Sequence, residues 1–160
     1  MTDTIVILTE QAIHPADADR ILALHEGETD LRYQVLVPHD VRRGLLVSVL
    51  DDLSLLDLRK LVQDLRREDP AEKEASAQRR LDTTIESLRA RGAEAVGEIT
   101  TDNPLPALGE AVANHEPREI IVITGPHAVE DTFHTDWASV ARDTLGLPVL
   151  HLYAGTGYVG

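Results

Sequence analysis

Short apolar runs alternate with helical patterns along the whole chain, and this alternation constrains the fold more than any other feature. The runs that indicate strands span residues 4–9, 31–40, 93–100, 118–125 and 147–154. Strands that alternate with helices predict an α/β fold with a parallel sheet and helices on both faces. Such a sheet binds ligands at the carboxyl ends of its strands, where the strand order reverses.

One-sided apolar stripes place the helices between these strands. Leu81, Ile85 and Leu88 lie at i, i+4 and i+7 before Gly92, which we expect to end their helix. Two further stripes consist of Leu105, Leu108 and Val112, and of Trp137, Val140, Ala141 and Leu145. An earlier helix is expected to start near Asp17 or Asp19 and to stop at Gly27.

One segment is surplus to this alternation. Too many residues separate the second strand from the helix before Gly92 for a single crossover. Leu58, Leu61, Val62 and Leu65 have helical spacing, which predicts a helical insertion over about 45–70. This insertion either covers its own core or binds a partner. We expect a single domain over residues 1–160, with a flexible tail over 154–160.

Composition excludes several classes of function. The formal net charge is -13, which opposes binding to nucleic acid and to anionic membrane surfaces. The chain has no cysteine, so disulfides, cysteine catalysis and cysteine-ligated metals are excluded. No signal peptide pattern and no apolar run of membrane-spanning length occur, so we expect a cytoplasmic protein.

The loop "TGPHAVEDTFHTDWAS", residues 124–139, lies between a strand and a helix, where many α/β proteins bind a phosphate. It contains one glycine, Gly125, together with the carboxylates Glu130, Asp131 and Asp136. No lysine or arginine occurs from residue 119 to 141. Its length is that of a phosphate loop, but its charge opposes a polyphosphate unless a divalent cation intervenes.

The order of elements and the segment "IIVITGPHAVEDTFHTDWASVARDTLGLPVLHL" resemble the universal stress protein family over nearly the whole chain. The resemblance implies five parallel strands in the order 3-2-1-4-5. ATP-binding members carry G-x2-G-x9-G-[S/T] after the fourth strand. Gly125 matches the first glycine, Ala128 replaces the second, and Ala138 and Ser139 occupy the last pair.

The resemblance also extends to two other regions. The segment "LPVLHL" is similar to the family's "CPVLVV", and "IVILTEQA" is similar to "ILVPVDGS". Thr9 and Glu10 therefore stand near the family's nucleotide, with Glu10 where the family has an aspartate. Val37 corresponds to a position beside the adenine. A homodimer, often formed through the last strand, is implied as well.

The sequence thus favours a non-catalytic stress-response or regulatory protein that acts by dimerisation and protein association and has largely lost ATP binding. An unidentified protein partner is expected, and no cofactor. The alternative is a nucleotide-binding sensor or slow ATPase, which uses the altered loop 124–139 to bind ATP. A third hypothesis is a small-molecule enzyme that uses His39, Asp40 or Glu10 in the crevice, although no nucleophile motif accompanies them.

Histidines in the loop raise the question of a metal. His127 and His134 lie near Glu130, Asp131 and Asp136, and these residue types bind zinc and similar ions. Their spacing matches no compact metal site. We therefore interpret them as exposed loop side chains and predict no metal site and no catalytic residue.

Overall fold

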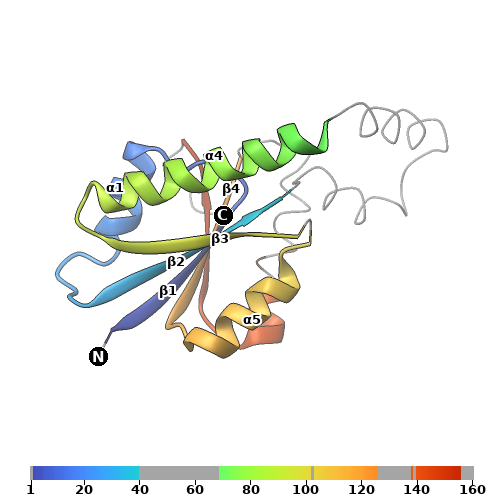
Figure 1. The fold of residues 1–160 in the computed structure, drawn as a ribbon. Coiled ribbons are helices and arrows are strands. Elements are labelled where there is room, and N and C mark those ends of the chain that lie inside the picture. The colour runs from blue at the N-terminus through green and yellow to red at the C-terminus, as the bar shows by residue number, and fades with distance from the viewer. Residues whose placement is uncertain (1, 40–68, 102, 126–137, 139, 156–160) are drawn as a thin grey trace.

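A parallel sheet of five strands forms the centre of the molecule (Figure 1). The computed structural model describes residues 2–39, 69–101, 103–125, 138 and 140–155. The strands are β1 (Asp3–Thr9), β2 (Leu31–Pro38), β3 (Glu94–Thr100), β4 (Glu119–Thr124) and β5 (Val149–Tyr153). Their spatial order is β3-β2-β1-β4-β5, as the resemblance implies. Every pairing is parallel, as the alternation of strands and helices predicts.

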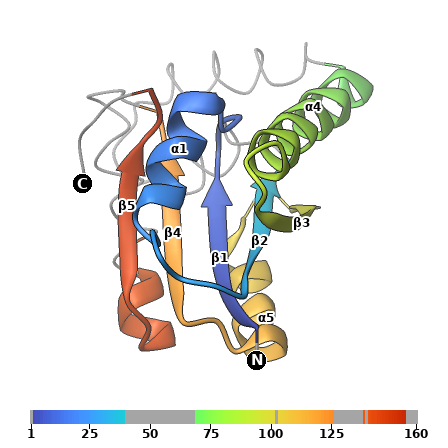
Figure 2. The ribbon, with the colours of Figure 1, turned by 90° about the vertical axis from the view of Figure 1, so that its left-hand side faces the viewer.

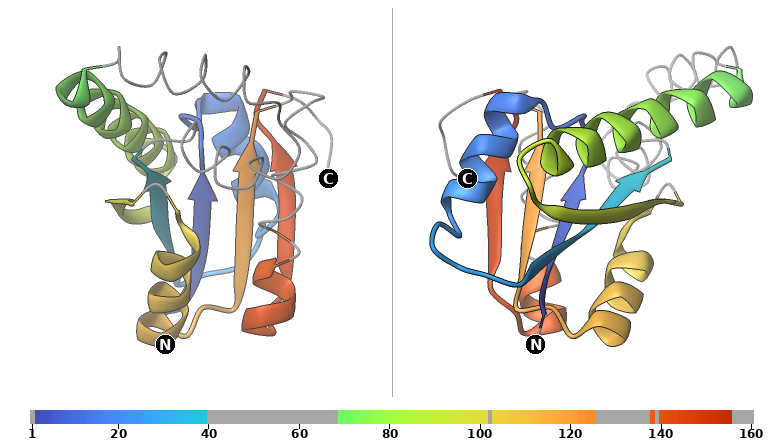
Figure 3. Two further views of the ribbon diagram at one scale, coloured as in Figure 1. Left: turned by 90° about the vertical axis from the view of Figure 1, so that its right-hand side faces the viewer. Right: turned by 60° about the vertical axis from the view of Figure 1, so that its left-hand side comes forward.

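Helices cover both faces of this sheet (Figures 2 and 3). On one face, α1 (Pro15–Ala23) and α4 (Pro70–Arg89) pack with Ile5 and Ile7 of β1 in a first core cluster. On the other, α5 (Leu105–His115) and the helical residues 140–145 pack with Val6 and Leu8 in a second cluster. Successive residues of a strand face opposite sides, so a strand buried on both faces is a continuous apolar run.

The helix boundaries differ from the sequence expectation at α1. Its first helical residue is Pro15, because proline has the backbone angle of a first helical turn and lacks the N–H that would be unpaired there. Asp17 lies inside the first turn and is 5% exposed. The helix ends at Ala23 with Leu24 as its cap, and Gly27, with φ +82°, belongs to the following turn.

The helical stripes were mostly predicted correctly. Leu81 and Leu88 of α4 and Leu108 of α5 are buried, and Gly92 follows α4 with φ +83°. Val140 is an exception, because its side chain is 42% exposed while the neighbouring Ala141 is buried. Among the described residues, no helix is long and apolar enough to cross a membrane.

Two expected segments fall largely outside the described residues. Of the predicted helical insertion over 45–70, only its end is described, where Asp69 caps α4 and Pro70 begins it. The first two residues of the expected flexible tail, Ala154 and Gly155, are hydrogen-bonded to the rest of the fold. The N–H of Ala154 donates to the carbonyl of Thr124 at 2.8 Å, and the N–H of Gly155 donates to the carboxylate of Asp17. Residues 156–160 lie outside the described part.

Candidate functional site

The candidate site lies at the carboxyl ends of the strands, beside β1 and β4. In the order β3-β2-β1-β4-β5, the chain adds β2 and β3 on one side of β1 and then β4 and β5 on the other side. Parallel α/β sheets bind ligands at this switch between the two sides. Thr9 ends β1 and Glu10 follows it there, while Gly125 follows β4. The structure therefore brings together three of the residues that the sequence assigns to a nucleotide site.

Glu10 and Gly125 are joined directly. The side-chain Oε1 of Glu10 accepts a hydrogen bond from the backbone N–H of Gly125, and the Glu10 residue is 5% exposed. The backbone N–H of Glu10 donates to the carbonyl of Ile123 at 3.2 Å. The carboxylate of Glu10 thus accepts the hydrogen bond of the first backbone N–H in the loop. Backbone N–H groups at such a position would otherwise be able to bind an anion.

A guanidinium from α4 holds the neighbouring strand ends. Arg80 Nη1 donates to the carbonyl of Glu10 at 2.8 Å, and its Nη2 donates to the carbonyls of Pro38 at 3.1 Å and His39 at 3.3 Å. Sequence reasoning missed Arg80. The available signal is its position one turn before Thr84, on the face of α4 that turns toward the sheet.

The remaining positions of the family motif are placed differently. Val37 is fully buried in the first core cluster, and Ala138 is 1% exposed in the second. The methyl group of Ala138 therefore fills the core. Ala128 and Ser139 lie outside the described residues. So do Asp40 and the loop residues His127, Glu130, Asp131, His134 and Asp136.

Hydroxyl groups near the site have partners within the protein. Thr9 Oγ1 donates to the carbonyl of Gln11 at 2.6 Å. The hydroxyl of Thr124 lies 2.8 Å from Nε2 of His151, but these residues are only 0% and 2% exposed. Such burial denies a substrate access to this hydroxyl, so the pair is best explained as part of the core.

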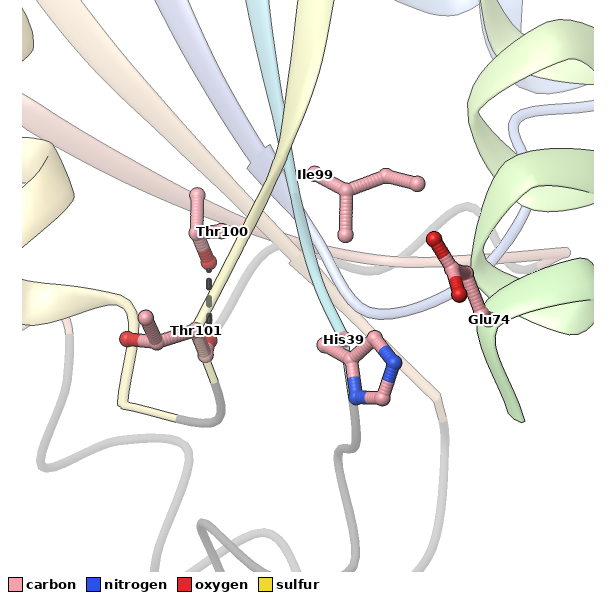
Figure 4. A pocket seen from close by; sticks show the side chains of 5 residues that line it. All are labelled: His39, Glu74, Ile99, Thr100 and Thr101. Atoms are coloured by element: carbon pink, nitrogen blue, oxygen red, sulfur yellow. Dashed lines mark hydrogen bonds between the residues drawn. The ribbon is translucent and has the colours of Figure 1, made fainter. Parts of the chain in front are cut away.

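A pocket of about 530 Å³ opens beside the ends of β2 and β3. It is lined by His39, Glu74, Ile99, Thr100 and Thr101, and Figure 4 shows Glu74 of α4 on the opposite side of the opening from Thr101. Thr100 Oγ1 donates to the carbonyl of Thr101 at 3.0 Å. The described part of the chain contains no group of three or more His, Asp or Glu side chains that could hold a metal ion.

A polar cluster of the buried His25 and Tyr33 and the partly exposed Glu119 lies at the opposite end of the sheet. The His25 ring follows α1, and its Nε2 lies 2.7 Å from Oε1 of Glu119, while its Nδ1 lies 3.1 Å from the hydroxyl of Tyr33. Tyr33 and Glu119 both pair with Ile5, so His25 spans β1 to reach its two neighbours. Sequence reasoning missed this cluster, whose one signal is a tyrosine inside an apolar strand.

Burial changes the acidity of the Tyr33 phenol in this cluster. Tyr33 is 2% exposed, and this burial, together with the negative charges of Glu119 and Glu28, raises the pKa of its phenol to about 12. The phenol therefore keeps its proton near neutral pH. Its oxygen lies within hydrogen-bond distance of Nδ1 of His25, and Nε2 of the same ring lies within hydrogen-bond distance of Glu119.

Comparison with known proteins gives one kind of likeness. No family model matches the chain, and no curated protein matches it. A crystal structure of a universal stress protein family protein from Arabidopsis thaliana, with AMP bound, matches with a TM-score of 0.54. The match covers 96% of this chain and 93% of that one. The fold is that of a universal stress protein. At 14% identity, the likeness to that universal stress protein concerns the fold alone.

Proposed function

We propose that this chain is a universal-stress-protein-like, non-catalytic stress-response or regulatory protein that has largely lost ATP binding and acts by association with a second copy and with a protein partner. The observation that carries the proposal is the hydrogen bond from the N–H of Gly125 to the buried carboxylate of Glu10. In the universal stress protein fold, Gly125 starts the loop that would hold a phosphate.

Charge explains why this contact opposes a nucleotide. A phosphate bound at the N–H of Gly125 would have to displace Glu10 or lie beside its carboxylate. Two like charges about 4 Å apart near a protein surface repel by roughly 1–4 kcal/mol. The guanidinium of Arg80 does not offset this repulsion freely, because it already donates to the carbonyls of Glu10, Pro38 and His39.

The non-catalytic part of the proposal rests on the hydroxyl groups. Those of Thr9 and Thr100 donate to backbone carbonyls, and that of Thr124 is enclosed. The net charge of -13 supports a protein partner rather than nucleic acid or an anionic membrane. We propose a cytoplasmic location for the same protein.

A nucleotide sensor or slow ATPase is the second candidate. It is favoured by the AMP in the Arabidopsis structure of the same fold. On this alternative, the loop 124–139 would bind ATP despite the contact between Glu10 and Gly125.

Calorimetric titration separates the two candidates. ATP with Mg²⁺, and AMP, are titrated into the wild type, Glu10→Ala and Glu10→Gln. Glu72→Ala, which removes an exposed carboxylate from the first turn of α4, is the charge-matched control. We expect no heat of binding from the wild type or the control. Micromolar binding by the wild type would overturn the proposal, and slow ATP hydrolysis would identify the alternative.

The variant arm tests the role of Glu10 itself. If Glu10→Ala binds ATP and the wild type does not, the carboxylate blocks a cradle that is otherwise intact. If no variant binds, the loss of binding extends beyond Glu10 into the loop. Both results agree with a protein that works without ATP.

A further inference from the structure

Arginine side chains donate hydrogen bonds to backbone carbonyls along both edges of the sheet. β3 and β5 are the edge strands. Unpaired N–H and C=O groups on an edge can pair with a strand of another molecule. Soluble proteins therefore protect their edges, or use them to associate.

Hydrogen bonds identify which residues of β5 point outward. The carbonyl of Pro148 accepts from Ile120, and the N–H of Ala154 donates to Thr124. The backbone N–H and C=O groups of the even-numbered residues of β5 therefore face β4. Since N–H and C=O directions alternate along a strand, Val149, His151 and Tyr153 face the outer edge.

Arginine side chains occupy two of these outward carbonyls. Arg142, in the last turn of helix 140–145, donates to the carbonyl of Val149 from Nη2 at 3.0 Å and from Nε at 3.2 Å. Arg20 of α1 donates through Nη2 to the carbonyl of Tyr153 at 3.0 Å. The two bonds lie at the two ends of β5 and bracket its centre.

The other edge repeats the arrangement. On β3, the carbonyl of Thr100 accepts from the N–H of His39, so Ala95 faces outward by the same alternation. Arg89 is the last residue of α4, and its Nε donates to the carbonyl of Ala95 at 2.9 Å. In both cases an arginine at the end of a helix reaches forward to the start of the edge strand that follows.

We propose that arginine side chains close both edges of the sheet to the addition of a strand: Arg89 at the edge of β3, and Arg142 and Arg20 at the edge of β5. Each guanidinium donates to a backbone carbonyl with which an added strand would have to pair, and it places a bulky cation along the edge. A second copy of this chain then associates through side chains and not by extending the sheet. This inference goes beyond the proposed function and changes the expected use of the last strand in dimerisation.

The wild type provides the first test. Amide hydrogen exchange of residues 149–153 is measured at low and high protein concentration, alongside sedimentation velocity. We expect the protection of these amides to be independent of concentration, whether or not the protein dimerises. Protection that rises as the dimer forms would overturn the inference, because it would show that β5 pairs in the dimer.

A double variant provides the second test. Arg142→Ala with Arg20→Ala removes the guanidinium donors from both carbonyls, and we expect its self-association to be about tenfold tighter than that of the wild type. The control is Arg79→Ala with Arg32→Ala, which removes the same charge from exposed positions. A folded double variant that associates no more than this control would overturn the inference.

The outcomes are distinguishable from a failure of the proposed function. Circular dichroism establishes whether the double variant is folded, and if it is not, exchange in the wild type alone decides. ATP binding by the wild type would remove the proposed loss of nucleotide binding but would leave the edge measurements unchanged. A wild-type dimer without added protection at β5 supports both proposals.

Discussion

The carboxylate of Glu10 accepts a hydrogen bond from the backbone N–H of Gly125, 115 positions along the chain. The bond joins the ends of β1 and β4 at the point where the strand order reverses. It gives Glu10 a structural role as well as the blocking role proposed above. The two roles are separable, because stability and nucleotide binding are measured independently.

Replacing Glu10 by alanine should destabilise the protein. The substitution leaves the N–H of Gly125 without its buried acceptor, and such a loss costs about 1–3 kcal/mol in the free energy of unfolding. Glu10→Gln keeps a carbonyl oxygen at the same position, so we expect it to lose less. Urea denaturation of both variants measures the difference, and equal stabilities of Glu10→Ala and the wild type would contradict the structural role.

The strands β1, β2 and β4 were predictable because they are buried on both faces. Ile5 to Leu8 form an unbroken apolar run, and their alternate side chains enter the two core clusters. The start of α1 was less predictable, since Pro15 and the aspartates after it are all acceptable at a helix start. Local preference leaves such boundaries open, and packing decides them.

The site was predictable in part for a related reason. The fold rule places Glu10 and Gly125 at one edge, but it does not say that the carboxylate reaches the amide. Arg80 and Arg142 were missed because periodicity describes apolar faces and not the reach of a long polar side chain. His25, Tyr33 and Glu119 come from separate elements, and only the register through Ile5 brings them together.

Tyr33 should make the protein sensitive to alkaline pH. Its pKa is raised from about 10 in an unfolded chain to about 12 in the fold. Its contribution to stability is therefore fully present below pH 10 and is lost as the pH rises through about 12. Absorbance titration should show one of the three tyrosines ionising late. Tyr33→Phe should lack both this titration and its share of the alkaline loss, and a Tyr33 that ionises near pH 10 would contradict the prediction.

Gly97 in β3 should not tolerate a side chain. A Cβ at this position would lie 2.6 Å from the carbonyl oxygen of Val35 and 2.8 Å from Cδ1 of Leu81. Gly97→Ala therefore forces the backbone of β2 to move, and we expect a loss of about 1–3 kcal/mol in thermal or urea unfolding. Gly109→Ala is the matched control, because nothing lies within 4 Å of its Cβ.

The control should act in the opposite direction. Gly109 lies in α5, where alanine is favoured over glycine by up to about 1 kcal/mol. The same chemical change is thus expected to destabilise at residue 97 and to be neutral or stabilising at residue 109. Two losses of equal size would show that the close contact between β3 and β2 does not decide the effect.

Thr84 of α4 should be required for its hydroxyl and not for its shape. Its Oγ1 accepts from the N–H of Ile13 at 3.0 Å and donates to the carbonyl of Arg80 at 2.7 Å, and both Thr84 and Ile13 are fully buried. Thr84→Val keeps the volume but leaves the N–H of Ile13 unpaired, which costs about 1–3 kcal/mol. Thr84→Ser keeps the hydroxyl and loses only a methyl group.

Hydrogen exchange at Ile13 distinguishes these two variants more sharply than global stability does. The bond from Ile13 to Thr84 holds the segment between β1 and α1 against α4, next to the carbonyl of Glu10 that Arg80 binds. We expect the Ile13 amide to lose protection in Thr84→Val and to keep most of it in Thr84→Ser. Equal protection in both variants would mean that packing, and not this hydrogen bond, holds the segment beside the site.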